Sequence, residues 1–130
     1  MRRQLVYMFF MLMLLLPVAT DAAVARNLNP REAFTMLGQR VDLYLLDVRT
    51  AGEYQQARLE GARLIPIDQL ARRIAELPKD RPILVYCAVG SRSAQAVNYL
   101  ARQGYPEIYN LSGGIYAWAQ NGYPVLQGRP

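Results

Sequence analysis

The chain has 130 residues, 52% of them apolar, which is enough for one continuous hydrophobic core and leaves little room for a second. Fifteen Lys and Arg against ten Asp and Glu give a net charge of +5, but the basic residues are scattered and no basic stripe is interleaved with aromatic residues, so we expect no nucleic-acid partner. The sequence holds no histidine and one cysteine, which excludes an internal disulfide and any histidine-assisted reaction.

The first 25 residues have the pattern of a secretory signal peptide. Two arginines follow the initial methionine, an uninterrupted apolar run covers residues 5–16, and small residues lead up to Ala25. We expect cleavage after Ala25, with cleavage after Ala22 as the alternative. The sequence then predicts an exported, periplasmic protein whose single domain covers residues 26–130, and we expect it to be a monomer.

The apolar run leaves a second interpretation open. It is shorter than the roughly 20 residues that a membrane-spanning helix needs, but residues 4–19 together approach that length. An uncleaved segment would anchor the protein in the inner membrane and give it a transient membrane contact.

In the first half of the remaining chain, helix signals alternate with short apolar runs. Asn29 is followed by proline and, three positions on, by glutamate, which predicts a helix that ends at Gly38. Residues 43–46 are a short buried strand, and the Thr-x-x-Glu capping pattern predicts a helix over residues 50–56. A second short strand at 62–65 is followed by a helix over 68–77, whose apolar residues recur at helical spacing.

The second half continues the alternation. Residues 83–86 form the strongest strand signal, a continuous β-branched run of the kind found when both faces of a strand are covered. A helix over 91–103, a strand over 108–111 and a last helix over 115–120 follow. The sequence therefore predicts an α/β fold with a mostly parallel central sheet and helices on both faces.

The single cysteine, Cys87, comes directly after the strand at 83–86, at the sheet end where ligands of such folds bind. A loop of small residues separates it from Arg92, which opens the next helix, so unpaired backbone N–H groups surround the sulfur and favour an anion. The helix dipole lowers a thiol pKa by about one unit, so loop amides and the charge of Arg92 must supply the rest. The alternative is an inert cysteine that ends a core strand, which needs no such loop.

Four segments carry a family resemblance. These are DVRTAGEY (47–54), EGARLIP (60–66), VYCAVGSRS (85–93) and LSGGIYAW (111–118), and together they resemble, in order, the signatures of a rhodanese domain over residues 28–125. A signal sequence on a single such domain is similar to the small periplasmic rhodaneses.

The resemblance implies a five-stranded parallel sheet flanked by helices, and a sulfurtransferase without a metal or cofactor. A donor, thiosulfate or a persulfide, would pass a sulfane sulfur to Cys87, and the resulting persulfide would pass it to cyanide or a thiol. The partners would then be small sulfur-containing anions and thiols. The cradle for the sulfur would be the backbone of Ala88, Val89, Gly90, Ser91, Arg92 and Ser93. Asp47 and Arg49 match a pair that supports this loop.

Two departures and two alternatives qualify this interpretation. Thiosulfate-preferring members often carry basic residues where this chain has Val89 and Glu53, which argues against thiosulfate as the physiological donor. A non-catalytic binding module with the same fold is one alternative. A cysteine-dependent phosphatase is the other, but such enzymes place one residue more between the cysteine and the arginine than the four found here.

Overall fold

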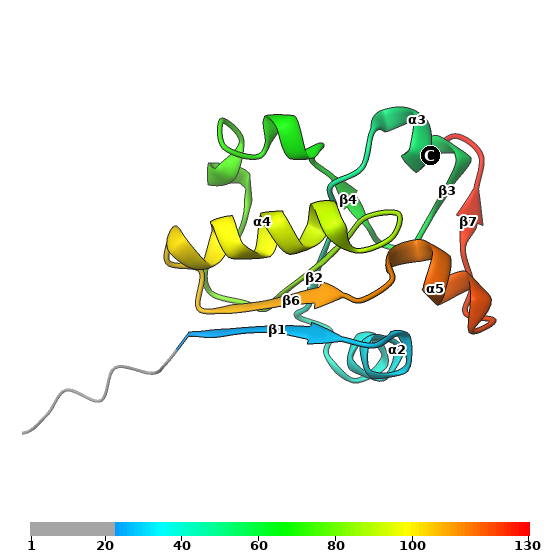
Figure 1. Ribbon diagram of the computed structural model, residues 1–130, viewed down its shortest axis with the longest axis horizontal. Coiled ribbons are helices and arrows are strands. Elements are labelled where there is room, and N and C mark those ends of the chain that lie inside the picture. The colour runs from blue at the N-terminus through cyan, green and yellow to red at the C-terminus, as the bar shows by residue number, and fades with distance from the viewer. Residues whose placement is uncertain (1–22) are drawn as a thin grey trace, which may run out of the picture.

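Five parallel strands form the central sheet of the computed structural model, which describes residues 23–130 (Figure 1). In spatial order they are β1 (Val24–Leu28), β6 (Glu107–Leu111), β5 (Ile83–Tyr86), β2 (Tyr44–Asp47) and β4 (Arg63–Leu64). Each pair is parallel, so all five strands end at the same edge of the sheet. The expected α/β architecture is confirmed.

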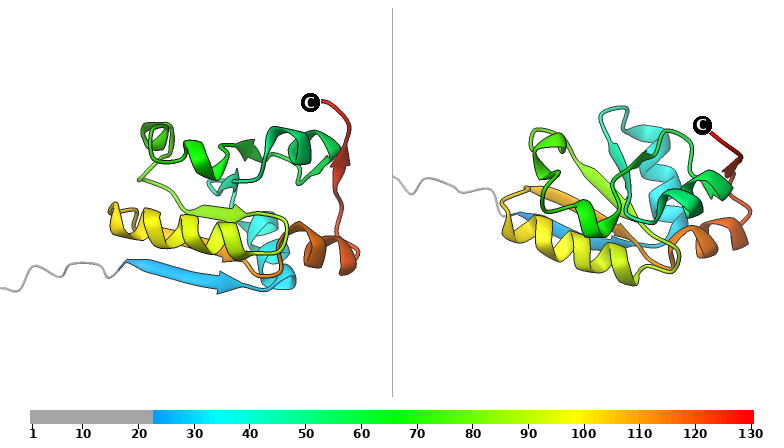
Figure 2. Two further views of the ribbon diagram at one scale, coloured as in Figure 1. Left: turned by 45° about the horizontal axis from the view of Figure 1, so that its top comes forward. Right: turned by 90° about the horizontal axis from the view of Figure 1, so that it is seen from above.

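Helices cover both faces of this sheet, as the sequence predicts. Helix α4 (Ser91–Arg102) packs on one face, and α2 (Pro30–Gln39) and α5 (Gly114–Gln120) pack on the other (Figure 2). Strand β5 separates two hydrophobic cores, because its successive side chains point to opposite faces. Ile83 and Val85 belong to the core under α4, and Leu84 and Tyr86 belong to the core under α2 and α5.

Two helices begin with the capping boxes that the sequence predicts. At the start of α2, the Asn29 side chain accepts a hydrogen bond from the Glu32 amide at 2.8 Å, and the Glu32 carboxylate accepts one from the Asn29 amide at 3.2 Å. Thr50 and Glu53 make the same reciprocal bonds at the start of α3 (Ala51–Gln56). Both pairs satisfy amides that the first helical turn leaves without partners.

The predicted helix over residues 68–77 is wrong. The segment forms two single 3-10 turns, η1 (Ile67–Gln69) and η2 (Ile74–Glu76). Pro78 follows Leu77 and disfavours a helical conformation there, and Leu77 is extended (φ −91°, ψ 133°). The Tyr105 hydroxyl donates to the carbonyl oxygens of Ile74 at 2.8 Å and Leu77 at 3.3 Å, so tertiary contacts fix these turns.

Three short strands were not predicted from the sequence. Strand β1 pairs with β6 along its whole length, from Val24 opposite Glu107 to Leu28 opposite Leu111. It begins inside the small-residue stretch that we interpret as the end of a signal peptide, whereas residues 1–22 lie outside the described residues. Strands β3 (Ala57–Arg58) and β7 (Leu126–Gln127) form a separate antiparallel ribbon. Within residues 23–130, none of the helices is long and apolar enough to cross a bilayer.

Candidate active site

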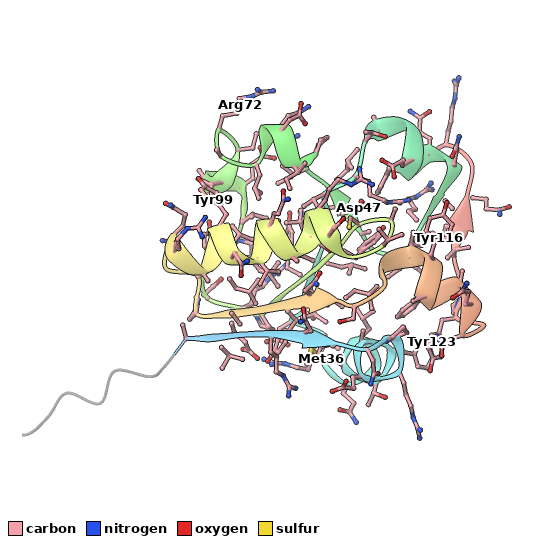
Figure 3. The ribbon with its side chains drawn as sticks, in the orientation of Figure 1. Met36, Asp47, Arg72, Tyr99, Tyr116 and Tyr123 are labelled. Carbon is pink, nitrogen blue, oxygen red and sulfur yellow. The ribbon has the colours of Figure 1, made fainter. Side chains whose placement is uncertain are left out.

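The single cysteine lies at the carboxyl end of β5, the central strand of the sheet. The chain then passes through a short loop and enters α4 at Ser91. Two residues that flank this loop, Asp47 and Tyr116, lie toward the same end of the molecule (Figure 3). Cys87 itself is fully buried, at 0% exposure. The structure thus brings the sulfur to the expected edge, but places it beneath the surface.

Hydrogen bonds to the sulfur distinguish this site from an inert core position. The backbone amide of Gly90 lies 3.1 Å from Cys87 Sγ, the amide of Ser93 lies 3.4 Å away, and the Ser93 hydroxyl lies 3.3 Å away. Burial raises the pKa of the Cys87 thiol, but these bonds, together with the Val89 amide, lower the pKa further than burial raises it. The net effect is a thiol pKa below its ordinary value.

The loop is held in place from α5. The amide of Ile115 donates to the carbonyl oxygen of Cys87 at 3.0 Å, and the amide of Tyr116 donates to that of Ala88 at 3.2 Å. Gly114 makes this approach possible, because a Cβ on it would lie 2.4 Å from the Ala88 carbonyl oxygen. In the sequence, the Gly113-Gly114 pair is only part of the LSGGIYAW segment (111–118), and its contact with the cysteine loop is visible only in three dimensions.

Asp47 and Arg49 form a buried ion pair beside the loop. Both Nε and Nη2 of Arg49 donate to the Asp47 carboxylate, the shortest bond being 2.7 Å, and the side chains are 5% and 0% exposed. Arg49 also donates to the Ala57 carbonyl oxygen at 2.6 Å and lies 5.3 Å from the centre of the Tyr86 ring. The pair therefore ties the end of β2 to the residue that precedes Cys87.

Arg92 makes a contact that the sequence does not reveal. Its two terminal nitrogens donate to the two carboxylate oxygens of Glu53 at 2.8 and 2.9 Å. The bond from Arg92 lowers the pKa of Glu53 to about 2, against the opposing effect of burial and with help from Thr50. The positive charge expected to act on the thiolate is therefore largely offset by a carboxylate from α3.

A pocket of about 320 Å³ lies beside the cysteine loop. Its apolar lining includes Ala57, Ala88, Ile115, Tyr116, Ala119 and Val125. Its polar lining comes from Arg49, Glu53, Gln56 and Gln127. A slightly larger hollow of about 360 Å³ lies over β1 and α2, but its lining shares no residue with the loop. The smaller pocket is therefore the one that belongs to the site.

The structure thus gathers the sequence-predicted residues at one edge of the sheet. Within residues 23–130, no group of three or more His, Cys, Asp and Glu side chains has the arrangement of a metal site. The sulfur, its donors and the two ion pairs are what the site offers chemically. They can hold an anionic sulfur, or a second sulfur bonded to it, without a basic side chain in direct contact.

The chain is similar to known proteins over most of its described length. A domain-family model described as "Rhodanese-like domain" matches residues 29–121. A protein of Allochromatium vinosum named sulfurtransferase is 42% identical over 90 residues, which cover 69% of this chain and 84% of that protein. The thiosulfate sulfurtransferase GlpE of Shewanella oneidensis is 34% identical over 74 residues, covering 57% of this chain and 73% of that protein.

A solved structure gives the same result. The crystal structure of a rhodanese-related protein from Thermoplasma volcanium superposes with a TM-score of 0.71 at 32% identity, over 78% of this chain and 97% of that chain.

Proposed function

The chain belongs to the family of rhodanese-like domains and is a sulfurtransferase of the rhodanese type, and from this premise we propose that it carries sulfur as a persulfide on Cys87. The donor is thiosulfate or a persulfide, and the acceptor is cyanide or a thiol. The substrates are small sulfur compounds, and the transferred sulfur itself is the reactive group, so the proposed reaction uses no metal or other cofactor.

The reaction has two steps with one covalent intermediate. The Cys87 thiolate attacks the outer sulfur of the donor, the donor's sulfur–sulfur bond breaks, and its electron pair leaves with sulfite or a thiolate. The outer sulfur remains on Cys87. An acceptor nucleophile then attacks that sulfur, and the electron pair of the second broken bond returns to Cys87 as a thiolate.

The observation that carries the proposal is the set of three hydrogen bonds to the buried sulfur from Gly90 and Ser93. They stabilise the thiolate without a histidine and lower the pKa of the thiol below its ordinary value. A binding module with a dispensable cysteine has no need for donors aimed at its sulfur. For that reason the catalytic interpretation is preferred.

The test compares the wild type with Cys87→Ser. The purified proteins are incubated with a sulfane-sulfur donor and then weighed intact by mass spectrometry, after which cyanide is added and thiocyanate is measured. We expect the wild type to gain the mass of one sulfur atom, to lose it to cyanide, and to release no phosphate from an aryl phosphate. An equal rate of thiocyanate formation in Cys87→Ser would show that Cys87 is dispensable and would support the binding module instead.

We propose further that the protein is exported and that its signal peptide is cleaved after Ala22. The amide of Val24 bonds to the Pro106 carbonyl oxygen at 2.8 Å, and Val24 and Ala25 pair with Glu107 and Ile108. Cleavage after Ala25 would remove both residues from β1, whereas cleavage after Ala22 keeps the strand whole.

The N-terminus of the protein in a periplasmic extract tests this proposal. We expect a mature chain that begins at Ala23. A chain that begins at Arg26 would show that the sheet tolerates the shorter strand, and a chain that keeps its first residues in the membrane fraction would favour the anchored alternative.

A further inference from the structure

The positive charges around the cysteine loop are compensated. Arg49 is held by the buried Asp47 carboxylate, and Arg92 is held by both oxygens of Glu53. The Glu53 carboxylate also accepts from the Thr50 amide and hydroxyl, so α3 fixes it in the position that engages Arg92. A dianion that approaches the sulfur therefore competes with a carboxylate for each guanidinium.

The adjoining pocket has the character of a site for an organic group. Its volume of about 320 Å³ lies at the lower end of the range for small-molecule sites. Most of its lining is apolar, and Gln56 and Gln127 add neutral carboxamides that can donate and accept hydrogen bonds. Val89, which follows Ala88 in the chain, and Tyr116, whose amide bonds to the Ala88 carbonyl oxygen, are 59% and 63% exposed and add apolar surface near Ala88. A small inorganic anion would leave most of this surface unused.

We propose that Glu53 determines the donor specificity of the enzyme by withholding Arg92 from dianionic donors, and that the pocket beside Ala88 binds the uncharged organic part of a small persulfide. This inference rests on the proposed persulfide chemistry of Cys87. The donor class is an organic persulfide, RSSH, and thiosulfate is disfavoured because it brings two negative charges to a site whose cations are already paired.

The proposed first step is balanced. The Cys87 thiolate attacks the terminal sulfur of RSSH, the sulfur–sulfur bond of the donor breaks, and its electron pair leaves on RS⁻. The terminal sulfur and its hydrogen remain on the protein as the Cys87 persulfide. No oxidant or reductant is consumed, because the sulfane sulfur only changes its carrier.

Glu53→Gln tests the charge argument. Glutamine keeps the capping pattern at the third helical position but removes the negative charge. Glu32→Gln is the matched control, because Glu32 has the same capping role in α2 and does not contact the cysteine loop. Rates of persulfide formation are measured with thiosulfate, a dianion, and with the persulfide of N-acetylcysteine methyl ester, whose organic part carries no charge.

We expect Glu53→Gln to raise the ratio of the thiosulfate rate to the organic persulfide rate about tenfold, the size of one charge-assisted hydrogen bond. Glu32→Gln should leave this ratio unchanged. A general loss of structure would lower both rates together, so the ratio isolates specificity. An unchanged ratio in Glu53→Gln overturns the role of Glu53.

Ala119→Phe tests the pocket. Ala119 is exposed on α5 and lines the pocket, so a larger side chain fills the space without entering the core. Gln120→Phe places the same ring on the adjacent exposed position, which does not line the pocket. We expect Ala119→Phe to reduce the ratio of the organic persulfide rate to the thiosulfate rate at least about fivefold, because the organic group loses apolar contact with the pocket. Gln120→Phe should leave this ratio unchanged.

The rates of the wild type with the two donors distinguish a failure of this inference from a failure of the proposed function. A faster rate with the organic persulfide than with thiosulfate supports the inference. A faster rate with thiosulfate overturns the inference and leaves the proposed function intact. Failure to form a persulfide from either donor overturns the proposed function.

Discussion

Replacing Gly114 with alanine should displace the cysteine loop, because the methyl group has no space. Gly114 has φ +60°, and its Cβ would lie 2.4 Å from the Ala88 carbonyl oxygen and 2.5 Å from the Cys87 carbonyl oxygen. These are backbone atoms, which cannot rotate away. The gap must widen by about 0.6 Å to reach even the 3.0 Å limit of real contacts, so the peptide that follows Cys87 must move.

Gly122→Ala is a control with the same backbone problem and no clash. Gly122 has φ +78°, and nothing lies within 4 Å of its added Cβ. Left-handed backbone costs a non-glycine residue about 1–2 kcal/mol, and this cost applies to both variants. Overpacking adds about 1–3 kcal/mol for Gly114→Ala alone. We therefore expect Gly114→Ala to lose about 2–5 kcal/mol of unfolding free energy and Gly122→Ala about 1–2 kcal/mol.

Urea unfolding and the rate of persulfide formation are measured on both variants. Misplacement of a reacting group by about 1 Å costs up to a hundredfold in rate, so Gly114→Ala should lose roughly tenfold to a hundredfold, measured on protein that is still folded. Gly122→Ala should retain the wild-type rate. If the two variants show equal stability and equal rates, the close approach between α5 and the loop does not position the sulfur, and the reasoning fails.

Three further predictions concern the groups around the sulfur. Ser93→Ala removes the hydroxyl near Cys87 and should raise the pKa of the thiol, seen as a shift of the ultraviolet titration of the thiolate to higher pH; an unshifted midpoint would contradict the role of the hydroxyl. Asp47→Asn leaves the buried Arg49 charge without its partner and should destabilise the fold by about 3–5 kcal/mol in urea unfolding, whereas a loss below about 1 kcal/mol, the value of an exposed pair, would refute the argument. The pKa of Glu53 is lowered in the folded state to about 2, so its ion pair stabilises the protein fully above a pH of about 4.5 and is lost as the pH falls toward 2; the difference in melting temperature between wild type and Glu53→Gln should shrink over that range, and a constant difference would count against the pair.

The parts of the fold that the sequence predicts correctly are those that local chemistry determines. The capping boxes at Asn29 and Thr50 depend on residues three positions apart, and the strand Ile83–Tyr86 is a continuous apolar run between clear breaks. The helix expected over 68–77 gives way to two 3-10 turns, of which the second ends at the extended Leu77 before Pro78 and is held by the hydroxyl of Tyr105, a residue far along the chain. Strand β1 is missed because its sequence, VARNL, has no continuous apolar run and only Leu28 is buried, so that the pairing with β6 is what makes it a strand.

The site divides in the same way. The position of Cys87 between a strand and a helix follows from the sequence, and so does the expectation of amides near its sulfur. The pairing of Arg92 with Glu53 joins residues on different elements, and each residue taken alone has an ordinary explanation, as a first-turn cation and a helix cap. The support of the loop by α5 likewise depends on how α5 packs, which no local pattern reveals.

The direction of β1 has a consequence for how the enzyme meets its substrates. Because β1 runs parallel to β5, the chain enters the sheet at Val24 on the edge opposite to the cysteine loop (Figure 1). Any attachment to a surface through the segment before Val24 would leave the reactive face turned outward. In a tethered form and in a released form, a diffusing sulfur carrier would then reach the cysteine loop and its pocket from the same side.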